Sequence, residues 1–352
     1  MSKTRWARVL IVEDSPTTAR MLVDGISRDP RLAVAGVALS AGEAVTLAEQ
    51  LQPDVMTVDL TLPDQTGLDV ILRVLNKSYV PIIVVSSEPS NGTTGTAFRA
   101  LLAGAADIVP KPSGAPGALN AFFTDLNERI ASLAAARAVP THRAAPARVA
   151  RNRRCADAAV ECVVVGASTG GPTALVEFLS GMGAEFPAPV VIVQHIAAPF
   201  IEGLVRWLNQ ETPITVKLAT DGELLQPSTG YIAPACADLV VKHGGRLSVK
   251  QAQPGRTHIA PSADVLFESA AEVYASRLIA VLLSGMGKDG AAGLLKVRAK
   301  GGKTFAQDEG SCTVFGMPGA AGRLGAVETF ADPRSIASTL RTLVERPERM
   351  AQ

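Results

Sequence analysis

Short apolar runs alternate with longer helix-type stretches along most of the chain. In the first third the apolar runs are Val9–Val12, Val34–Ala38, Val55–Val58, Ile82–Val85 and Asp107–Val109. Ala/Leu-rich segments such as Ala41–Gln50 lie between them, and Ser15-Pro16 is typical of a helix start. Five strand–helix alternations predict an α/β domain with a doubly wound parallel sheet over residues 1–130.

Polar residues that could form a site follow four of these five predicted strands. The residues at these ends are Glu13, Asp14, Asp59, Ser86 and Lys111. The carboxyl ends of parallel strands share one edge, so we expect a carboxylate cluster with a lysine opposite it. Oxygen-only ligands favour Mg²⁺, and such a cluster can accept a phosphoryl group on one carboxylate. Each acid alone is better explained as a solvated loop residue or a helix cap, but five such residues at successive strand ends favour a site.

A second α/β pattern begins at Val160. Its strongest runs are Val163–Val165, Val190–Val193 and Leu278–Leu283. Ser168, His195 and Asp289 each follow one of these runs, so the sheet edge can bring them together. Acyl transfer needs such a trio, because a serine hydroxyl requires a base, and a carboxylate orients that base.

The glycine turn that carries Ser168 has two interpretations. Val163–Gly171 reads as a strand entering a tight turn, and Pro172–Leu179 as the helix after it, whose free N–H groups suit an oxyanion. The motif alone fits a phosphate-binding or purely structural turn equally well. Asp289 could also cap the helix beginning near Gly290, alone or in addition.

Three further histidines compete with His195 for the role of base. His142 falls in a linker and His243 in a predicted hairpin turn, whereas His258 precedes Pro261 and is the reserve candidate. The pairing of His195 with the turns of Ser168 and Asp289 favours it as the base.

Composition and charge narrow the class of protein. The 352 residues with a net charge of +1 indicate two domains and give no global case for nucleic-acid binding. Residues 131–159 are rich in Ala, Arg and Pro, which predicts a flexible linker, and its Arg151–Arg154 cluster is better explained as solvated than as a nucleic-acid contact. The four cysteines form no CxxC pair. Without a signal-type segment or a membrane-length apolar run, we expect a cytoplasmic protein with no membrane insertion.

Residues 1–130 resemble response-regulator receiver domains, which have a flavodoxin-like fold. The resemblance rests on Glu13-Asp14, Asp59 with Gly67 downstream, Ser86 and Lys111-Pro112. It implies that Asp59 is the phosphoacceptor, that Glu13, Asp14 and Asp59 hold Mg²⁺, and that Ser86 and Lys111 are switch residues. It also implies a cis bond between Lys111 and Pro112. The family usually has an aromatic residue where this chain has Ile108.

Residues 160–352 resemble the catalytic domain of the chemotaxis protein-glutamate methylesterases, the CheB family. The matching motifs are Gly166–Gly171, Gln194-His195, Gly230–Pro234, Pro261–Phe267, Gly285–Gly290 and Phe315–Pro318. The resemblance implies a doubly wound α/β methylesterase domain with Ser168 as nucleophile, His195 as base and Asp289 as orienting acid. It also implies that the Met286 backbone contributes to the oxyanion hole and that Thr169 supports the site. The chain departs from the family at Ile196-Ala197 and Ile259-Ala260, which border the expected substrate groove.

Together the two resemblances imply a phosphorylation-activated enzyme. It would hydrolyse glutamyl methyl esters on the cytoplasmic helices of chemoreceptors, and deamidate receptor glutamines, with a histidine kinase as phosphodonor. Relief of inhibition by the receiver domain would activate it. The esterase site itself would need no cofactor. Two other hypotheses are a phospho-regulated binding module with a vestigial hydrolase site, and a hydrolase of small esters.

Overall fold

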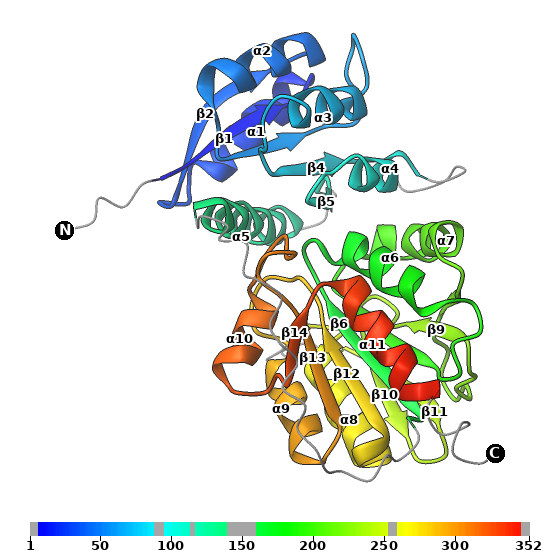
Figure 1. The fold of residues 1–352 in the computed structure, drawn as a ribbon. Helices are drawn as coiled ribbons and strands as arrows, with labels where there is room; N and C mark the ends of the chain where they lie inside the picture. Colours follow the sequence, from blue (N-terminus) through cyan, green and yellow to red (C-terminus); the bar gives the residue numbers. More distant parts are fainter. Residues whose placement is uncertain (1–5, 88–94, 113–116, 139–159, 253–258, 346–352) are drawn as a thin grey trace. The chain divides into compact units, whose positions relative to one another are not determined.

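The computed structural model describes residues 6–87, 95–112, 117–138, 160–252 and 259–345, and the chain divides into two compact units (Figure 1). The first unit spans Met1–Pro140 and the second Thr141–Gln352. Each unit is built around a parallel sheet flanked by helices, which confirms the predicted fold class.

The first unit contains one five-stranded parallel sheet in the order β2-β1-β3-β4-β5. Its strands are β1 (Ala7–Val12), β2 (Leu32–Ala38), β3 (Val55–Val58), β4 (Ile82–Ser86) and β5 (Asp107–Pro110). Its helices are α1 (Pro16–Ile26), α2 (Ala41–Leu51), α3 (Gly67–Leu75), α4 (Thr96–Leu102) and α5 (Ala118–Ala138). The five predicted strands are therefore all present, and this strand order is that of flavodoxin-like sheets.

Local signals in the sequence explain where these elements begin. Ser15 caps α1 through a hydrogen bond from the Thr18 N–H, and Pro16 occupies the first turn, as the sequence predicted. Helix α3 starts directly against the residue that follows β3. A Cβ at Gly67 would lie only 2.1 Å from the backbone oxygen of Asp59, so this close approach requires a glycine. A glycine there lets the helix start beside the predicted phosphoacceptor.

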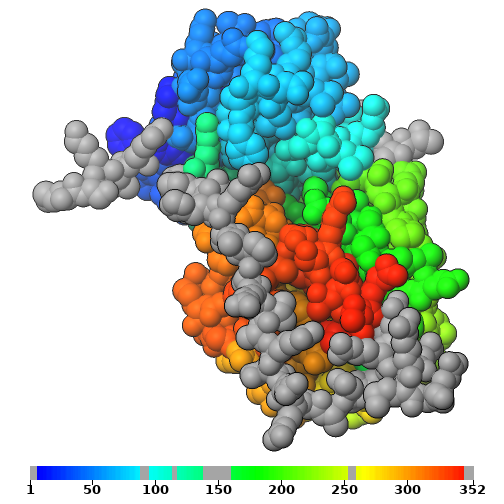
Figure 2. Space-filling view, in the orientation of Figure 1, coloured from blue at the N-terminus to red at the C-terminus, as the bar shows by residue number. Residues whose placement is uncertain are grey.

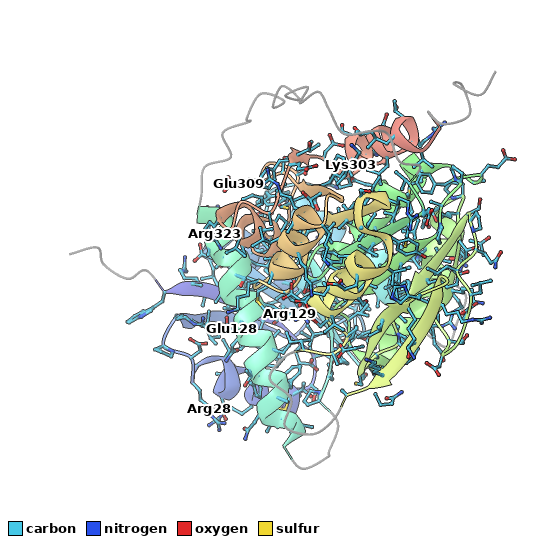
Figure 3. All side chains as sticks on the ribbon, turned by 90° about the horizontal axis from the view of Figure 1, so that it is seen from below. Arg28, Glu128, Arg129, Lys303, Glu309 and Arg323 are labelled. Atoms are coloured by element: carbon cyan, nitrogen blue, oxygen red, sulfur yellow. The ribbon has the colours of Figure 1, made fainter. Side chains whose placement is uncertain are left out.

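Two charged side chains of α5, Glu128 and Arg129, which are labelled in Figure 3, connect this helix to other parts of its own unit. Arg129 forms ion pairs with Asp107 on β5 and with Asp125 on its own helix. The neighbouring Glu128 lies 2.7 Å from the Arg31 guanidinium. The helix continues to Ala138, and the rest of the predicted linker, residues 139–159, falls outside the described residues.

The prediction of a cis bond between Lys111 and Pro112 is wrong. In the described part of the chain, the cis peptide bond lies between Ala260 and Pro261, in the second unit.

The second unit has a seven-stranded sheet in the order β14-β13-β12-β6-β7-β9-β8, in which every neighbouring pair is parallel. Its strands are β6 (Cys162–Ala167), β7 (Val190–Gln194), β8 (Thr215–Leu218), β9 (Thr229–Ile232), β12 (Leu278–Leu282), β13 (Lys303–Gln307) and β14 (Thr329–Ala331). The chain leaves β6 toward β7 on one side and later returns to β12 on the other. The β6–β12 junction is therefore the topological switch point, where such sheets bind ligands.

Helices cover both faces of this sheet, as its continuous apolar strands require. They are α6 (Gly171–Met182), α7 (Ile201–Glu211), α8 (Ala263–Tyr274), α9 (Ala291–Ala299), α10 (Met317–Arg323) and α11 (Pro333–Glu345), with the 3-10 turns η1 (Ala198–Phe200) and η2 (Ala275–Arg277). Residues of α8, α9 and α10 share one apolar core with the sheet, whereas α6 packs against α7 and α11. Helix α11 buries Ile336, Ala337 and Leu340 and leaves its other face exposed, visible in red in Figure 2.

A two-stranded antiparallel hairpin completes the second unit. Its strands are β10 (Ala237–Lys242) and β11 (Arg246–Gln251), and His243 is exposed in the turn between them, as the sequence predicted. No helix among the residues described is both long and apolar enough to cross a bilayer.

Candidate active site

Ser168 lies in the turn that joins β6 to α6, at the switch point of the second sheet. Its N–H donates to the Ser284 carbonyl at 3.0 Å, and its carbonyl accepts from the Gly171 N–H at 2.8 Å. Gly170, at φ 74°, takes the left-handed conformation that the turn needs. A Cβ at Gly170 would also lie 2.4 Å from the Thr313 side chain. The turn is therefore fixed from both sides and holds Ser168 at the start of a helix.

His195 follows the last residue of β7, the neighbour of β6. Its N–H donates to the Ala167 carbonyl at 2.9 Å, which continues the parallel pairing up to the residue before Ser168. Its imidazole is 9% exposed, and Nε2 lies 2.9 Å from Oδ2 of Asp289. The β6–β7 pairing thus brings the backbones of His195 and Ser168 side by side, and the ring turns toward the loop after β12.

Asp289 is surrounded by hydrogen-bond donors from the N-terminus of α8. The Ser262 hydroxyl donates to Oδ1 at 2.8 Å, and the N–H groups of Ala263 and Asp264 donate to Oδ2 and Oδ1 at 2.7 and 3.2 Å. Burial raises the pKa of Asp289, but the hydrogen bonds from His195, Ala263 and Ser262 outweigh it and leave the pKa below its usual value. The carboxylate is therefore held in its charged form against the imidazole.

The alternative role predicted for Asp289 needs a correction. Asp289 does not cap the helix that follows it, because α9 has Gly290 at its N-cap and no side-chain capping bond. It contacts the first turn of α8 instead, a helix from an earlier part of the chain. The favourable interaction of its negative charge with a helix N-terminus is therefore a tertiary contact between distant segments.

The loop after β12 passes directly against Ser168. A Cβ at Gly285 would lie 2.8 Å from the Ser168 Cβ, so this glycine allows the approach. The Gly285 carbonyl accepts from the N–H groups of Gly316 and Met317, which fixes the backbone just before Met286. On the other side, the Thr169 carbonyl accepts from the Ser284 hydroxyl at 2.8 Å. Both residues predicted to assist the site therefore adjoin the Ser168 turn.

Sequence reasoning missed three polar residues that hold this arrangement together. They are Gln194, Ser262 and Ser284, all almost fully buried. Ser262 and Ser284 were considered only as alternative nucleophiles and set aside, because neither has a glycine turn comparable to that of Ser168. Gln194 was predicted only as part of the Gln194-His195 motif. For Gln194 and Ser284 the available signal was a polar residue at or just after the end of a buried strand, where an unpaired polar side chain is costly. For Ser262 it was a serine directly before a predicted helix. The reserve base His258 and the linker residue His142 lie outside the described residues.

The first unit brings its predicted polar residues together at one sheet edge. Carboxylate oxygens of Glu13, Asp14 and Asp59 all lie within 4.8 Å of one another. The Lys111 ammonium lies 2.7 Å from both Asp59 Oδ2 and Glu13 Oε2. Ser86 is buried beside them, and its carbonyl accepts from the Lys111 N–H at 3.0 Å. The predicted cluster is therefore contiguous in the fold.

Electrostatics show that this cluster is short of positive charge. Burial raises the pKa of Glu13, and its hydrogen bond to Lys111 does not fully offset this. Burial lowers the pKa of Lys111, but its bonds to Asp59 and Glu13 outweigh burial and raise it. Three carboxylates face one ammonium, and all the donor atoms are oxygens. The cluster therefore fits a small divalent cation. Ile108, where an aromatic residue was expected, is buried in β5.

Comparison with known proteins agrees with both halves of this description. Residues 163–340 match the family model "CheB methylesterase", and residues 9–122 match "Response regulator receiver domain". A protein-glutamate methylesterase/protein-glutamine glutaminase 2 of Anaeromyxobacter dehalogenans is 41% identical over 96% of both chains. A protein-glutamate methylesterase/protein-glutamine glutaminase 3 of Myxococcus xanthus is 40% identical over 91% of this chain and 89% of its own length.

One solved structure supports the likeness of the second unit. The catalytic domain of the Thermotoga maritima CheB methylesterase is 37% identical, with a TM-score of 0.50. The match covers 53% of this chain and the whole of that domain.

Proposed function

The chain belongs to the CheB methylesterase family, and from that premise we propose that Ser168, His195 and Asp289 form its catalytic triad. The observation that carries the proposal is the 2.9 Å contact between His195 Nε2 and an Asp289 carboxylate that the start of α8 holds in its charged form. The family and the named relatives give the substrate class: glutamyl methyl esters, and the side-chain amide of glutamine.

The chemistry follows from this geometry. With its Nε2–H directed at Asp289, the imidazole has its lone pair on Nδ1, and that nitrogen accepts the Ser168 proton. Ser168 Oγ attacks the ester carbonyl, the protonated imidazole gives its proton to the leaving methoxide, and methanol departs. Water then attacks the acyl-enzyme, which releases glutamate and restores the serine. With an amide substrate the leaving group is ammonia.

Developing negative charge on the substrate oxygen needs donors near Ser168. The free N–H groups at the start of α6 and the backbone at Met286 are suited to this role, since both adjoin the serine turn. Thr169 would support them through its carbonyl, which Ser284 anchors.

The receiver unit would supply the regulation. Asp59 is the proposed phosphoacceptor, Lys111 the contact for the phosphoryl group and Ser86 the switch hydroxyl. The crowded carboxylates of Glu13, Asp14 and Asp59 would hold Mg²⁺, which neutralises charge as an anionic phosphodonor approaches. The phosphodonor would be a histidine kinase, and methylated chemoreceptor helices would be the substrate. The cytoplasm stays the predicted location, because both partners are expected there.

The alternative of a binding module with a vestigial hydrolase site finds no support in the active-site geometry. A vestigial triad has no need of a partly buried carboxylate with four hydrogen-bond donors around it, yet Asp289 has them. A small-ester hydrolase would use the same residues, so the substrate has to be tested directly.

The decisive experiment measures methanol release from methylated chemoreceptor membranes with Mg²⁺, with and without a small phosphodonor. We expect release that Ser168→Ala abolishes, and stimulation by phosphodonor that Asp59→Asn abolishes while basal release continues. Release that survives Ser168→Ala would overturn the proposed nucleophile. No release from wild type would favour a different substrate or the binding module. Stimulation without Asp59 would overturn the proposed phosphoacceptor.

A further inference from the structure

Gln194 is the last residue of β7, immediately before the proposed base, and the chemistry above does not use it. Its side chain is 1% exposed. The amide nitrogen donates to the carbonyl of Ser168 at 2.9 Å and to the carbonyl of His195 at 3.0 Å. A single NH₂ group therefore joins the backbones of the proposed nucleophile and the proposed base.

We infer that Gln194 is a positioning residue that fixes the backbone of Ser168 relative to that of His195. The parallel ladder between β6 and β7 ends at this point, with the pair Ala167 and Gln194 and the bond from the His195 N–H to the Ala167 carbonyl. Beyond this pair, β6 continues into the glycine turn and β7 continues into the loop before η1. The Gln194 side chain extends the connection by one residue, across the place where the two reacting side chains are attached.

The orientation of this amide follows from its partners. Both neighbours of the nitrogen are carbonyl oxygens, so exchanging Nε2 and Oε1 would place three acceptors together. Oε1 is buried and has no hydrogen-bond partner among the residues the structure describes. It lies so close to the start of α6 that a Cβ at Gly171 would be 2.2 Å from it. Placing the two donors of Gln194 on these two carbonyls therefore leaves its own Oε1 buried without a hydrogen bond and requires a glycine at position 171.

A plainer explanation is that Gln194 only satisfies buried backbone groups at a strand end. The same sheet offers a matched control in Gln307, the last residue of β13, which is 2% exposed. Its Oε1 accepts from the Ser284 N–H at 2.7 Å, and its amide nitrogen donates to the Ser311 carbonyl at 2.8 Å. Gln307 therefore has the same residue type, burial and place in its strand. It bonds to Ser284, which adjoins the serine turn, but to neither Ser168 nor His195.

The test uses full-length Gln194→Met, which keeps the volume and removes both donors, beside Gln307→Met. One readout is the rate constant with which a fluorophosphonate probe modifies Ser168, since displacement of fluoride by Oγ needs no receptor. The other readouts are kcat and KM for methanol release, and the melting temperature. We expect Gln194→Met to lower both the probe rate constant and kcat by roughly 10- to 100-fold with KM almost unchanged, as misplacement of reacting groups does.

The control should behave differently from the test variant. Gln307→Met should lower the melting temperature by an amount similar to Gln194→Met, because each removes two buried hydrogen bonds, yet keep the probe rate constant within about threefold of wild type. Equal rate losses in the two variants, or a normal rate in Gln194→Met, would overturn the positioning role. If Gln194→Met does not fold, Gln194→Asn takes its place, because its shorter amide keeps the donors but cannot reach both carbonyls. For Gln194→Asn too, a rate loss equal to that of Gln307→Met, or a normal rate, would overturn the positioning role.

This inference rests on the proposed function, and Ser168→Ala separates the two. Probe labelling that persists in Ser168→Ala would overturn the proposed nucleophile. Labelling that is lost in Ser168→Ala but normal in Gln194→Met would leave the nucleophile standing and overturn the inference alone.

Discussion

The two units differ in how they surround a carboxylate that is wholly or partly buried. Asp289 is surrounded by donors from its own domain, and its pKa lies below the usual value. Glu13 shares its site with Asp14, Asp59 and one lysine, and burial raises its pKa. The first site has the donors its charge needs, whereas the second fits an added cation. From this contrast we expect the proposed esterase chemistry to need no added metal, and the proposed phosphorylation of Asp59 to need one.

The largest expected effect is that of Asp289→Asn on catalysis. An amide cannot stabilise the imidazolium and no longer selects the tautomer with its lone pair on Nδ1, so kcat for methanol release should fall about 10⁴-fold. Labelling of Asp59 by a phosphodonor should stay normal, since the two sites belong to different units. A kcat within tenfold of wild type would show that His195 does not depend on this carboxylate.

Removal of Mg²⁺ should have the opposite effect to Asp289→Asn: it should abolish phosphorylation of Asp59 and leave basal methanol release unchanged. Chelation should stop phosphate incorporation at Asp59, because the crowded carboxylates then repel an anionic phosphodonor, and the stimulated part of methanol release should disappear. Coupling between regulatory and active sites is commonly about 5- to 150-fold, so a loss of that order is expected. Basal release is the internal control and should not change. A chelator that abolishes basal release would contradict the proposal of a metal-free esterase.

Deletion of residues 1–140 tests how the two units communicate. If the unphosphorylated receiver inhibits the esterase, the remaining unit should release methanol faster than the intact unphosphorylated protein, by about the factor that phosphorylation gives. The isolated catalytic domain of the Thermotoga relative, whose full length this chain matches, makes such a fragment reasonable. A fragment that is stably folded but no faster than the intact protein would remove the inhibition model and leave activation to some other contact.

The sequence predicted the strand ends of both sites well, because parallel sheets collect the residues after their strands at one edge. Ser168, His195 and Asp289 follow β6, β7 and the β12 loop as expected. The sequence alone could not predict that Asp289 lies at the N-terminus of α8. That contact joins segments that are distant in sequence, and it depends on how α8 packs.

Side-chain partners were similarly beyond sequence reasoning. The two bonds from the Gln194 amide depend on strand register, and the Ser284 hydroxyl reaches a carbonyl 115 residues earlier in the chain. The cis bond before Pro112 was implied by the family resemblance, whereas among the residues described the cis bond lies before Pro261. Patterns along the chain therefore located the reactive groups, whereas the residues that hold them required the fold.

The smallest expected effect is a pH dependence of stability that comes from Asp289. A carboxyl whose pKa is lowered by folding stabilises the folded state fully above its unfolded pKa of about 3.9, and this contribution is lost as the pH falls through the folded value. Asp289→Asn should therefore be less stable than wild type by about 2 kcal/mol at pH 7, and the gap should narrow below about pH 4. Urea unfolding followed by fluorescence measures this gap when both proteins also carry Trp6→Phe, which leaves Trp207, buried in α7 of the same unit, as the one tryptophan. Asp64→Asn, a substitution in the other unit, should leave the Trp207 transition unchanged. A gap that stays constant from pH 7 to pH 3 would show that the charge of Asp289 contributes nothing to folding, and the contrast with Glu13 would then concern catalysis alone.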